Sequence, residues 1–190
     1  MNSQNLVPKL QTFVDGVSDL LDQNQVEPEF HPEIGELLKD LVKKDDCLDP
    51  KYAVPHPEYY QQFLLYVDPQ ERFSVVSFVW GPGQETPIHN HTVWGVIGML
   101  RGKEREQAFE VASDHTLTPK GDEVTLSSGD IGFVSPTIGD VHRVRNAFDD
   151  QTSISIHIYG GDIGKIKRNV FPVDGSEKKE FISGYSTPMK

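Results

Sequence analysis

The chain has 190 residues, 36% of them hydrophobic, and a single cysteine. This length suits one core, and no change of composition marks an internal boundary, so we expect one domain spanning residues 1–190. The 29 acidic residues outnumber the 18 basic ones and give a formal net charge of -11, which argues against nucleic acid or an anionic membrane as the main partner.

The amino-terminal sequence MNSQNLVPKLQTFVDG has neither the basic start nor the unbroken apolar run of a secretory signal. No segment approaches the roughly 20 apolar residues that span a bilayer, so we expect a cytoplasmic protein. Residues 1–50 instead show the apolar spacing of two helices. The two apolar stripes are Leu10, Phe13, Val14, Val17 and Leu21, and then Ile34, Leu37, Leu38, Leu41 and Val42.

Cys47 lies in the segment KKDDCLDP, which has the composition of a solvated loop. Its acidic neighbours raise the pKa of the thiol, so Cys47 is a poor candidate for a nucleophile. A single cysteine also excludes a disulfide within these residues and a cysteine-based zinc site.

From about residue 73 the chain changes to short β-branched and aromatic runs separated by Gly and Pro. Many short strands at this spacing are typical of a sandwich or a barrel. The runs are RFSVVSFVW, WGVIGML, QAFEV, EVTL, DIGFVS, HRVRNAF and SISIHIY.

Three histidines in this part of the chain have metal-ligand spacing. His89 and His91 are two residues apart in GPGQETPIHNHTVWG. On a strand this spacing puts both imidazoles on one face, about 7 Å apart at the backbone and within reach of one metal ion. His142 follows about fifty residues later in SPTIGDVHRVRNAF. The remaining histidines outside strands sit in contexts that favour solvation: His31, His56 and His115.

The strand TSISIHIYGG has two chemically different faces, because side chains alternate along a strand. Its isoleucines form an apolar face, and Ser155, His157 and Tyr159 form a polar one. On the pattern alone, an ordinary surface strand is the simpler interpretation. Likewise Arg168, in the basic run GKIKR, is on spacing alone a surface charge.

Taken together, the two histidine segments resemble the paired motifs of the cupin superfamily: a first motif ending in HxH and a second reading G…P…G-D-x-H-x3-N. The second motif matches Gly129, Pro136, Gly139, His142 and Asn146. The resemblance implies a mainly β, jelly-roll-like small barrel over about residues 60–185, with the helical segment 1–50 packed against it. The first-motif glutamate of many cupins is absent, and three neutral histidines remain as the implied metal ligands.

The segments HNHTVWGVIGMLRG, SPTIGDVHRV and SISIHIYG, with Arg168 downstream, resemble the thiol dioxygenase branch of the cupins, the family of cysteine dioxygenase and 3-mercaptopropionate dioxygenase. This resemblance implies one Fe(II) per chain on His89, His91 and His142. It also implies that the polar face of residues 155–159 looks into the barrel as a hydrogen-bonded relay, and that Arg168 binds a substrate carboxylate.

Two departures separate this chain from the cysteine-specific animal type. The cysteine that crosslinks there to the tyrosine matching Tyr159 is replaced by Gly95. The carboxylate-binding arginine of a Y-x-R-x-L segment is replaced by Gln62 in YQQFL. Gln62 together with Arg168 resembles the bacterial 3-mercaptopropionate type.

Three neutral imidazoles leave Fe(II) its full charge, which favours an anionic thiolate ligand that then supplies the electrons for oxidation by O2. We therefore expect an oxidoreductase that adds both atoms of O2 to the thiolate of 3-mercaptopropionate to give 3-sulfinopropionate. The alternatives are the same chemistry on cysteine or mercaptosuccinate, a non-catalytic metal- or ligand-binding cupin, and a cupin isomerase or other enzyme that uses Zn(II) or Mn(II).

Overall fold

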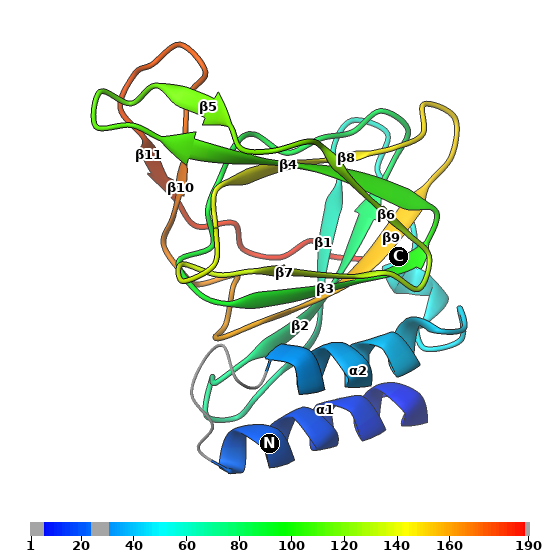
Figure 1. The fold of residues 1–190 in the computed structure, drawn as a ribbon. Coiled ribbons are helices and arrows are strands. Elements are labelled where there is room, and N and C mark those ends of the chain that lie inside the picture. Colours follow the sequence, from blue (N-terminus) through cyan, green and yellow to red (C-terminus); the bar gives the residue numbers. More distant parts are fainter. Residues whose placement is uncertain (1–5, 24–30, 189–190) are drawn as a thin grey trace.

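The computed structural model describes residues 6–23 and 31–188. Two helices come first and the strands follow, as the apolar spacing predicts (Figure 1). The elements are α1 (Pro8–Asp22), α2 (His31–Val42), the 3-10 helix η1 (Pro50–Tyr52), β1 (Gln61–Val67), β2 (Ser74–Trp80), β3 (Gly95–Arg101), β4 (Lys103–Val111), β5 (Leu117–Pro119), β6 (Val124–Ser127), β7 (Ile131–Val134), β8 (His142–Asn146), β9 (Ser153–Tyr159), β10 (Arg168–Val170) and β11 (Lys179–Phe181).

The strands form two antiparallel sheets that face each other (Figure 1). One sheet has the order β1-β2-β9-β3-β7, and in the other β4 pairs with β5, β6 and β8. Strands β10 and β11 form a separate two-stranded ribbon. The predicted fold class, a mainly β barrel with helices packed against it, is confirmed.

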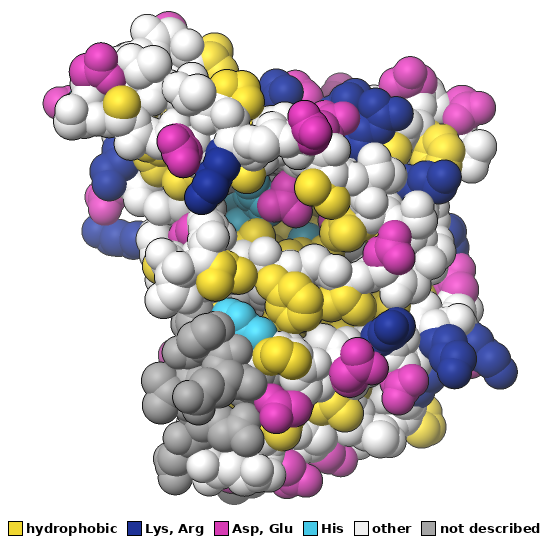
Figure 2. Space-filling model, viewed as in Figure 1, with side chains coloured by type: hydrophobic (Ala, Val, Ile, Leu, Met, Phe, Trp, Pro, Cys, Tyr) yellow, Lys and Arg dark blue, Asp and Glu magenta, His cyan; other side chains and the backbone are white. Residues whose placement is uncertain are grey.

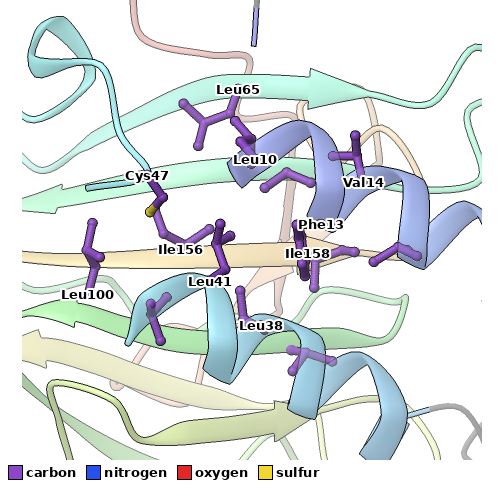
Figure 3. Close-up of a cluster of buried hydrophobic side chains, with 14 of the residues drawn as sticks. Leu10, Phe13, Val14, Leu38, Leu41, Cys47, Leu65, Leu100, Ile156 and Ile158 are labelled. Atoms are coloured by element: carbon purple, nitrogen blue, oxygen red, sulfur yellow. The ribbon is translucent and has the colours of Figure 1, made fainter. Parts of the chain in front are cut away.

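The helices cover the outer face of the five-stranded sheet, and their apolar stripes form the main core with it (Figure 3). A Cβ atom at Gly98 of β3 would lie only 2.7 Å from Cγ of Leu38. Glycine therefore lets α2 approach this strand closely. Burying a side chain such as Leu38, which is fully buried, contributes about 1.5–3 kcal/mol to folding.

Strand β9 lies in the middle of this sheet, between β2 and β3. Its isoleucines point to the helices and belong to the main core (Figure 3). Since side chains alternate, Ser155, His157 and Tyr159 point the other way, into the space between the two sheets, and all three are buried. The polar face of this strand is therefore not a solvated surface.

Two of our interpretations about the first fifty residues are wrong. Cys47 is 2% exposed and packs in the main core, where burial raises the pKa of its thiol to about 11. His31 is also buried, with its ring beside those of Trp94 and Phe133. In both cases the tertiary fold covers a side chain that the local sequence suggested to be solvated.

Within the described residues, neither helix has the length and apolar composition needed to cross a membrane. The cytoplasmic location stays a prediction.

Candidate metal centre and substrate cavity

The structure brings His89, His91 and His142 together at one point. Their rings lie pairwise 4.9 Å apart between centroids, and one nitrogen of each lies within 4.8 Å of the others. His142 begins β8, whereas His89 and His91 lie in the connection between β2 and β3. The main chains of His89 and His142 are joined by two reciprocal hydrogen bonds of 2.9 and 3.0 Å, which fix the connection to the strand.

Each of the three rings is oriented through its Nδ1 atom. In His89 this nitrogen lies 3.0 Å from the carbonyl oxygen of Pro87. In His91 it lies 2.8 Å from Oδ1 of Asp140, and in His142 it lies 2.7 Å from Oε1 of Glu106. An Nδ1–H that donates to these oxygens leaves the Nε2 lone pair of every ring for a metal ion.

Asp140 also holds the backbone of the histidine connection. Its two carboxylate oxygens accept hydrogen bonds from the backbone N–H groups of His91 and Thr92 at 2.8–3.0 Å. Thr92 has a positive φ of 62°, a conformation that is uncommon for a residue with a side chain. Asp140 therefore fixes both the ring and the main chain of His91.

The electrostatics of this cluster favour neutral imidazoles. Burial lowers the pKa of His89 and His91 well below the usual value, and the charges of the neighbouring histidines lower it further. Neutral imidazole is the form that binds a metal ion. Three imidazole ligands without a cysteine fit the metals that prefer imidazole, among them iron and zinc.

The polar face of β9 forms a continuous hydrogen-bonded chain beside this cluster. The Oγ atom of Ser155 lies 2.8 Å from Nε2 of His157, and Nδ1 of His157 lies 2.8 Å from the hydroxyl of Tyr159. The Tyr159 ring stacks on His91 with a centroid distance of 5.2 Å. This series of hydrogen-bonded side chains therefore ends next to the three histidines.

Close packing surrounds Tyr159. Gly95 of β3 is its register partner, and a Cβ atom there would lie 2.9 Å from two ring carbons of the tyrosine. Glycine at this position therefore leaves room for the ring. Burial raises the pKa of Tyr159, so the phenol keeps its proton at neutral pH.

A cavity of about 890 Å³ opens beside the histidines. Figure 2 shows histidine side chains, in cyan, next to an acidic side chain, in magenta, in a hollow between the two sheets. Of the three histidines only His89 lines the 890 Å³ cavity, together with Phe78, Arg168 and Gln62. None of the described residues that line it is an aspartate or a glutamate, so Arg168 is its only permanently charged wall residue within the described chain.

Arg168 is the first residue of β10 and is 3% exposed. Its Nη2 donates to Oγ of Ser183 at 2.6 Å, and its guanidinium lies 4.7 Å from the centroid of the Phe181 ring. Its Nε has no hydrogen-bond partner among the described residues. A buried guanidinium with an unused donor is costly unless an anion completes it, so this group fits a carboxylate ligand.

Gln62 of β1 is buried on the same wall. Its amide nitrogen donates to Oγ of Ser183 and to the carbonyl oxygen of Gly184, both at 3.1 Å. Gln62 and Arg168 thus share Ser183 as a partner. The side-chain oxygen of Gln62 remains as a neutral acceptor.

Sequence reasoning missed several residues of this site. Asp140 is part of the G-D-x-H motif, so its place two residues before His142 was an available signal. Glu104, Glu106 and Ser183 had no such signal, because each meets the site only through contacts with segments far apart in the sequence. Glu104 and Glu106 lie in a charged run, KERE, that the alternation of apolar residues does not mark as a strand.

Comparison with known proteins agrees with this geometry. The family model described as cysteine dioxygenase type I matches residues 3–169. Cysteine dioxygenase type 1 of Rattus norvegicus is 28% identical over 90 residues, covering 46% of this chain and 44% of that protein. The protein of the same name from Danio rerio is 26% identical over 92 residues, covering 46% and 45%. Each alignment therefore spans less than half of the relative.

Among solved structures, an uncharacterized conserved protein with a double-stranded β-helix domain from Klebsiella pneumoniae aligns with a TM-score of 0.48 and 20% identity, covering 60% of this chain and 89% of that one. The family model, in contrast, covers most of the present sequence, including all three histidines. The chain belongs to the cysteine dioxygenase type I family.

Proposed function

We propose that this chain is a non-haem iron thiol dioxygenase that converts 3-mercaptopropionate to 3-sulfinopropionate. The observation that carries the proposal is that a single cavity is lined both by His89, one of the three clustered histidines, and by the buried guanidinium of Arg168. This arrangement suits a small molecule with a metal-binding group at one end and a carboxylate at the other. The family match supports a thiol as the metal-binding group.

His89, His91 and His142 would hold one Fe(II), and the carboxylates of Asp140 and Glu106 would keep two of these rings in the ligand tautomer. Bound there, Fe(II) supplies the site at which a thiolate and O2 meet, so that both oxygen atoms pass to sulfur and no external reductant is needed. Zinc has no redox chemistry and in the same ligands would not support this reaction, which makes metal identity part of the test.

Arg168 would anchor the substrate carboxylate. Guanidinium is a planar fork with five N–H donors, of which Nε is unused in the structure. A carboxylate that accepts from this group would hold the thiol end toward His89, because both residues line the same cavity. Phe181, under the guanidinium, keeps it in place.

The lining of the cavity favours a thiol acid without an amine. Cysteine carries an α-ammonium group, and the described residues lining the cavity include no carboxylate that would compensate its charge. Mercaptosuccinate carries a second carboxylate, and Gln62 offers a neutral amide in place of a second cation. The relatives are named for cysteine, so cysteine is the first alternative substrate.

Tyr159, His157 and Ser155 would act on the substrate side of the metal ligands without binding the metal. The ring of Tyr159 stacks on His91, and His157, itself hydrogen-bonded to Ser155, holds the tyrosine hydroxyl in position. Phe78 lines the cavity, and the centroid of its ring lies 4.3 Å from that of His157. The Phe78 ring therefore stands between the cavity and the hydrogen-bonded side chains of β9.

The test combines metal analysis with oxygen uptake. The protein, reconstituted with Fe(II), Zn(II) or Mn(II), is given 3-mercaptopropionate, cysteine, mercaptosuccinate or cysteamine. We expect uptake only with iron, and a kcat/KM for 3-mercaptopropionate at least ~10-fold above that for cysteine. A higher value for cysteine would overturn the substrate assignment, and no uptake with any thiol would favour a binding protein.

A further inference from the structure

The hydrogen-bonded chain on β9 continues beyond Ser155 to a carboxyl group that the reaction as proposed does not use. Oε2 of Glu104, on β4, lies 2.9 Å from Oγ of Ser155. Glu104 is 2% exposed, and Ser155 is the only hydrogen-bond partner of its carboxyl group among the described residues. Four buried side chains from two facing strands thus form one row, which ends at Tyr159 beside the metal ligands.

The hydroxyl of Ser155 decides how this row is arranged, because it has one proton and three neighbours. Nε1 of Trp80, which is only a donor, lies 3.1 Å from Ser155 Oγ and takes one lone pair. The hydroxyl therefore donates to one of the other two neighbours, Glu104 and His157, and accepts a hydrogen bond from the other. Both arrangements satisfy every polar atom of Ser155.

Burial lowers the pKa of His157 to about 3, so its ring is neutral and has one donor and one acceptor nitrogen. The direction of its hydrogen bond with Ser155 therefore fixes the direction of its hydrogen bond with Tyr159. When Glu104 is ionised it only accepts, so Ser155 donates to it and Nε2–H of His157 donates to Ser155. Nδ1 of His157 is then an acceptor and takes the proton of the Tyr159 hydroxyl. The phenol proton points away from the metal ligands.

When Glu104 is protonated, each bond reverses. Its O–H donates to Ser155, Ser155 donates to Nε2 of His157, and Nδ1–H of His157 donates to the oxygen of Tyr159. The phenol proton is then free to be donated to a ligand beside the histidines. When Glu104 ionises, its proton passes to Ser155, the Ser155 proton to Nε2 of His157 and the Nδ1 proton to the oxygen of Tyr159, which releases its own proton to an acceptor outside the row. The row as a whole thus loses one proton, and the reverse shift takes one up.

We propose that Glu104 is a positioning residue whose protonation state sets the direction of the whole row, and so determines whether Tyr159 offers a hydrogen-bond donor at the site. The proposal deepens the proposed function and rests on it only for the use made of that donor. A neutral Glu104 gives the arrangement that binds an anionic ligand, and an ionised Glu104 gives the arrangement that does not.

The surroundings of Glu104 allow both states near neutral pH. Burial raises its pKa to about 7, the negative charge of Glu106 on the same strand acts in the same direction, and the hydrogen bond from Ser155 opposes both. The register partners of Glu104 are uncharged: Leu126 of β6 and Asn146 of β8. Two further uncharged side chains lie next to Ser155: Trp80 of β2, which donates to it, and Met99 of β3, its register partner. The other titratable groups of the row are His157 and Tyr159.

The direction of the row can be measured without turnover, as the tautomer of His157. The 190-residue chain, labelled with ¹⁵N in histidine and loaded with diamagnetic Zn(II), is studied by NMR from pH 5 to pH 9. The His157 signals are assigned by their absence from His157→Gln. We expect Nδ1–H at low pH and Nε2–H at high pH, with a transition that disappears in Glu104→Gln.

Two further variants keep the test decisive. Ser155→Ala cuts the row but retains Glu104, so the tautomer of His157 should no longer respond to pH. Glu110→Gln removes a carboxylate from an exposed position of the same strand and should leave the transition unchanged. A single tautomer across the range in the wild type, or a transition that persists in Glu104→Gln, would overturn the proposal. Because no substrate is present, neither result bears on whether the chain is a thiol dioxygenase.

Discussion

Glu104 and His157 share one hydrogen-bonding partner, the hydroxyl of Ser155, at 2.9 and 2.8 Å. This relationship joins the two sheets of the barrel inside its core, because Glu104 belongs to β4 and His157 to β9. Burial disfavours the ionised form of a carboxyl group, and one hydrogen bond from Ser155 compensates only part of this cost. The pH dependence of stability should therefore report on Glu104.

The first prediction is that stability falls as the pH rises through the pKa of Glu104, which burial raises to about 7. Between pH 4.5, the usual pKa of a glutamate, and about pH 7, the folded chain binds more protons than the unfolded chain. The free energy of unfolding therefore decreases as the pH rises through this range. The loss attributable to this group is at most about 3 kcal/mol. Thermal unfolding at pH 5 and pH 9 measures it, and Glu104→Gln should remove this part of the difference. An identical pH dependence in the variant would show that Glu104 is not titrating there.

The second prediction concerns Asp140, which orients His91 through its ring and its backbone. Asp140→Asn keeps the shape but removes the charge, and metal affinity should fall by roughly 10- to 100-fold, as for other groups that orient a metal-binding histidine. Competition with a chelator measures the change. Asp150→Asn, at an exposed position, is the matched control and should bind metal as the wild type does. Equal affinity in both variants would mean that the carboxylate does not act on the metal site.

The third prediction concerns Arg168 as the carboxylate anchor. Removing one partner of a buried, hydrogen-bonded charge pair costs roughly 2–5 kcal/mol, so Arg168→Ala should lower kcat/KM for 3-mercaptopropionate by at least ~30-fold. Cysteamine, which has no carboxylate, should be affected far less if it reacts. Lys167→Ala removes an exposed neighbouring charge and should change neither value. An unchanged KM for 3-mercaptopropionate in Arg168→Ala would remove this residue from the substrate site.

The fourth prediction is that Tyr159→Phe retains the metal ion but turns over more slowly. The ring still stacks on His91, and only the hydroxyl next to His157 is lost. Turnover should fall by about 10- to 100-fold while the iron content stays the same. Iron analysis and steady-state kinetics on one preparation check both parts. Normal turnover would reduce the role of the tyrosine to packing.

Strand β8, which carries His142, and the β9 row were predictable because their apolar residues alternate with the site residues. His89 and His91, whose spacing suggested a strand, lie instead in the connection between β2 and β3. The barrel interior holds these polar side chains, and the helices cover the opposite, apolar face. The family resemblance was needed to choose between this arrangement and a surface strand, since both have the same alternation. It was also needed for Arg168, whose basic neighbours suggested a solvated position, whereas the structure buries it.

The parts that were not predictable depend on contacts between distant segments. Strand β4 begins at Lys103, inside a charged run, and its inward carboxylates Glu104 and Glu106 are stabilised by Ser155 and His142 from other strands. Strands β10 and β11 are three residues each, too short for an apolar pattern to mark them. Cys47 appeared solvated because its neighbours are acidic, although its own side chain packs into the core.

The most direct test of the central claim is the source of the oxygen atoms in the product. The iron-loaded protein is given 3-mercaptopropionate under ¹⁸O₂ in unlabelled water, and the product is analysed by mass spectrometry. The account predicts 3-sulfinopropionate in which both sulfinate oxygens carry the label. A product with one labelled oxygen or none, or a disulfide in place of the sulfinate, would contradict the assignment of this chain as a thiol dioxygenase.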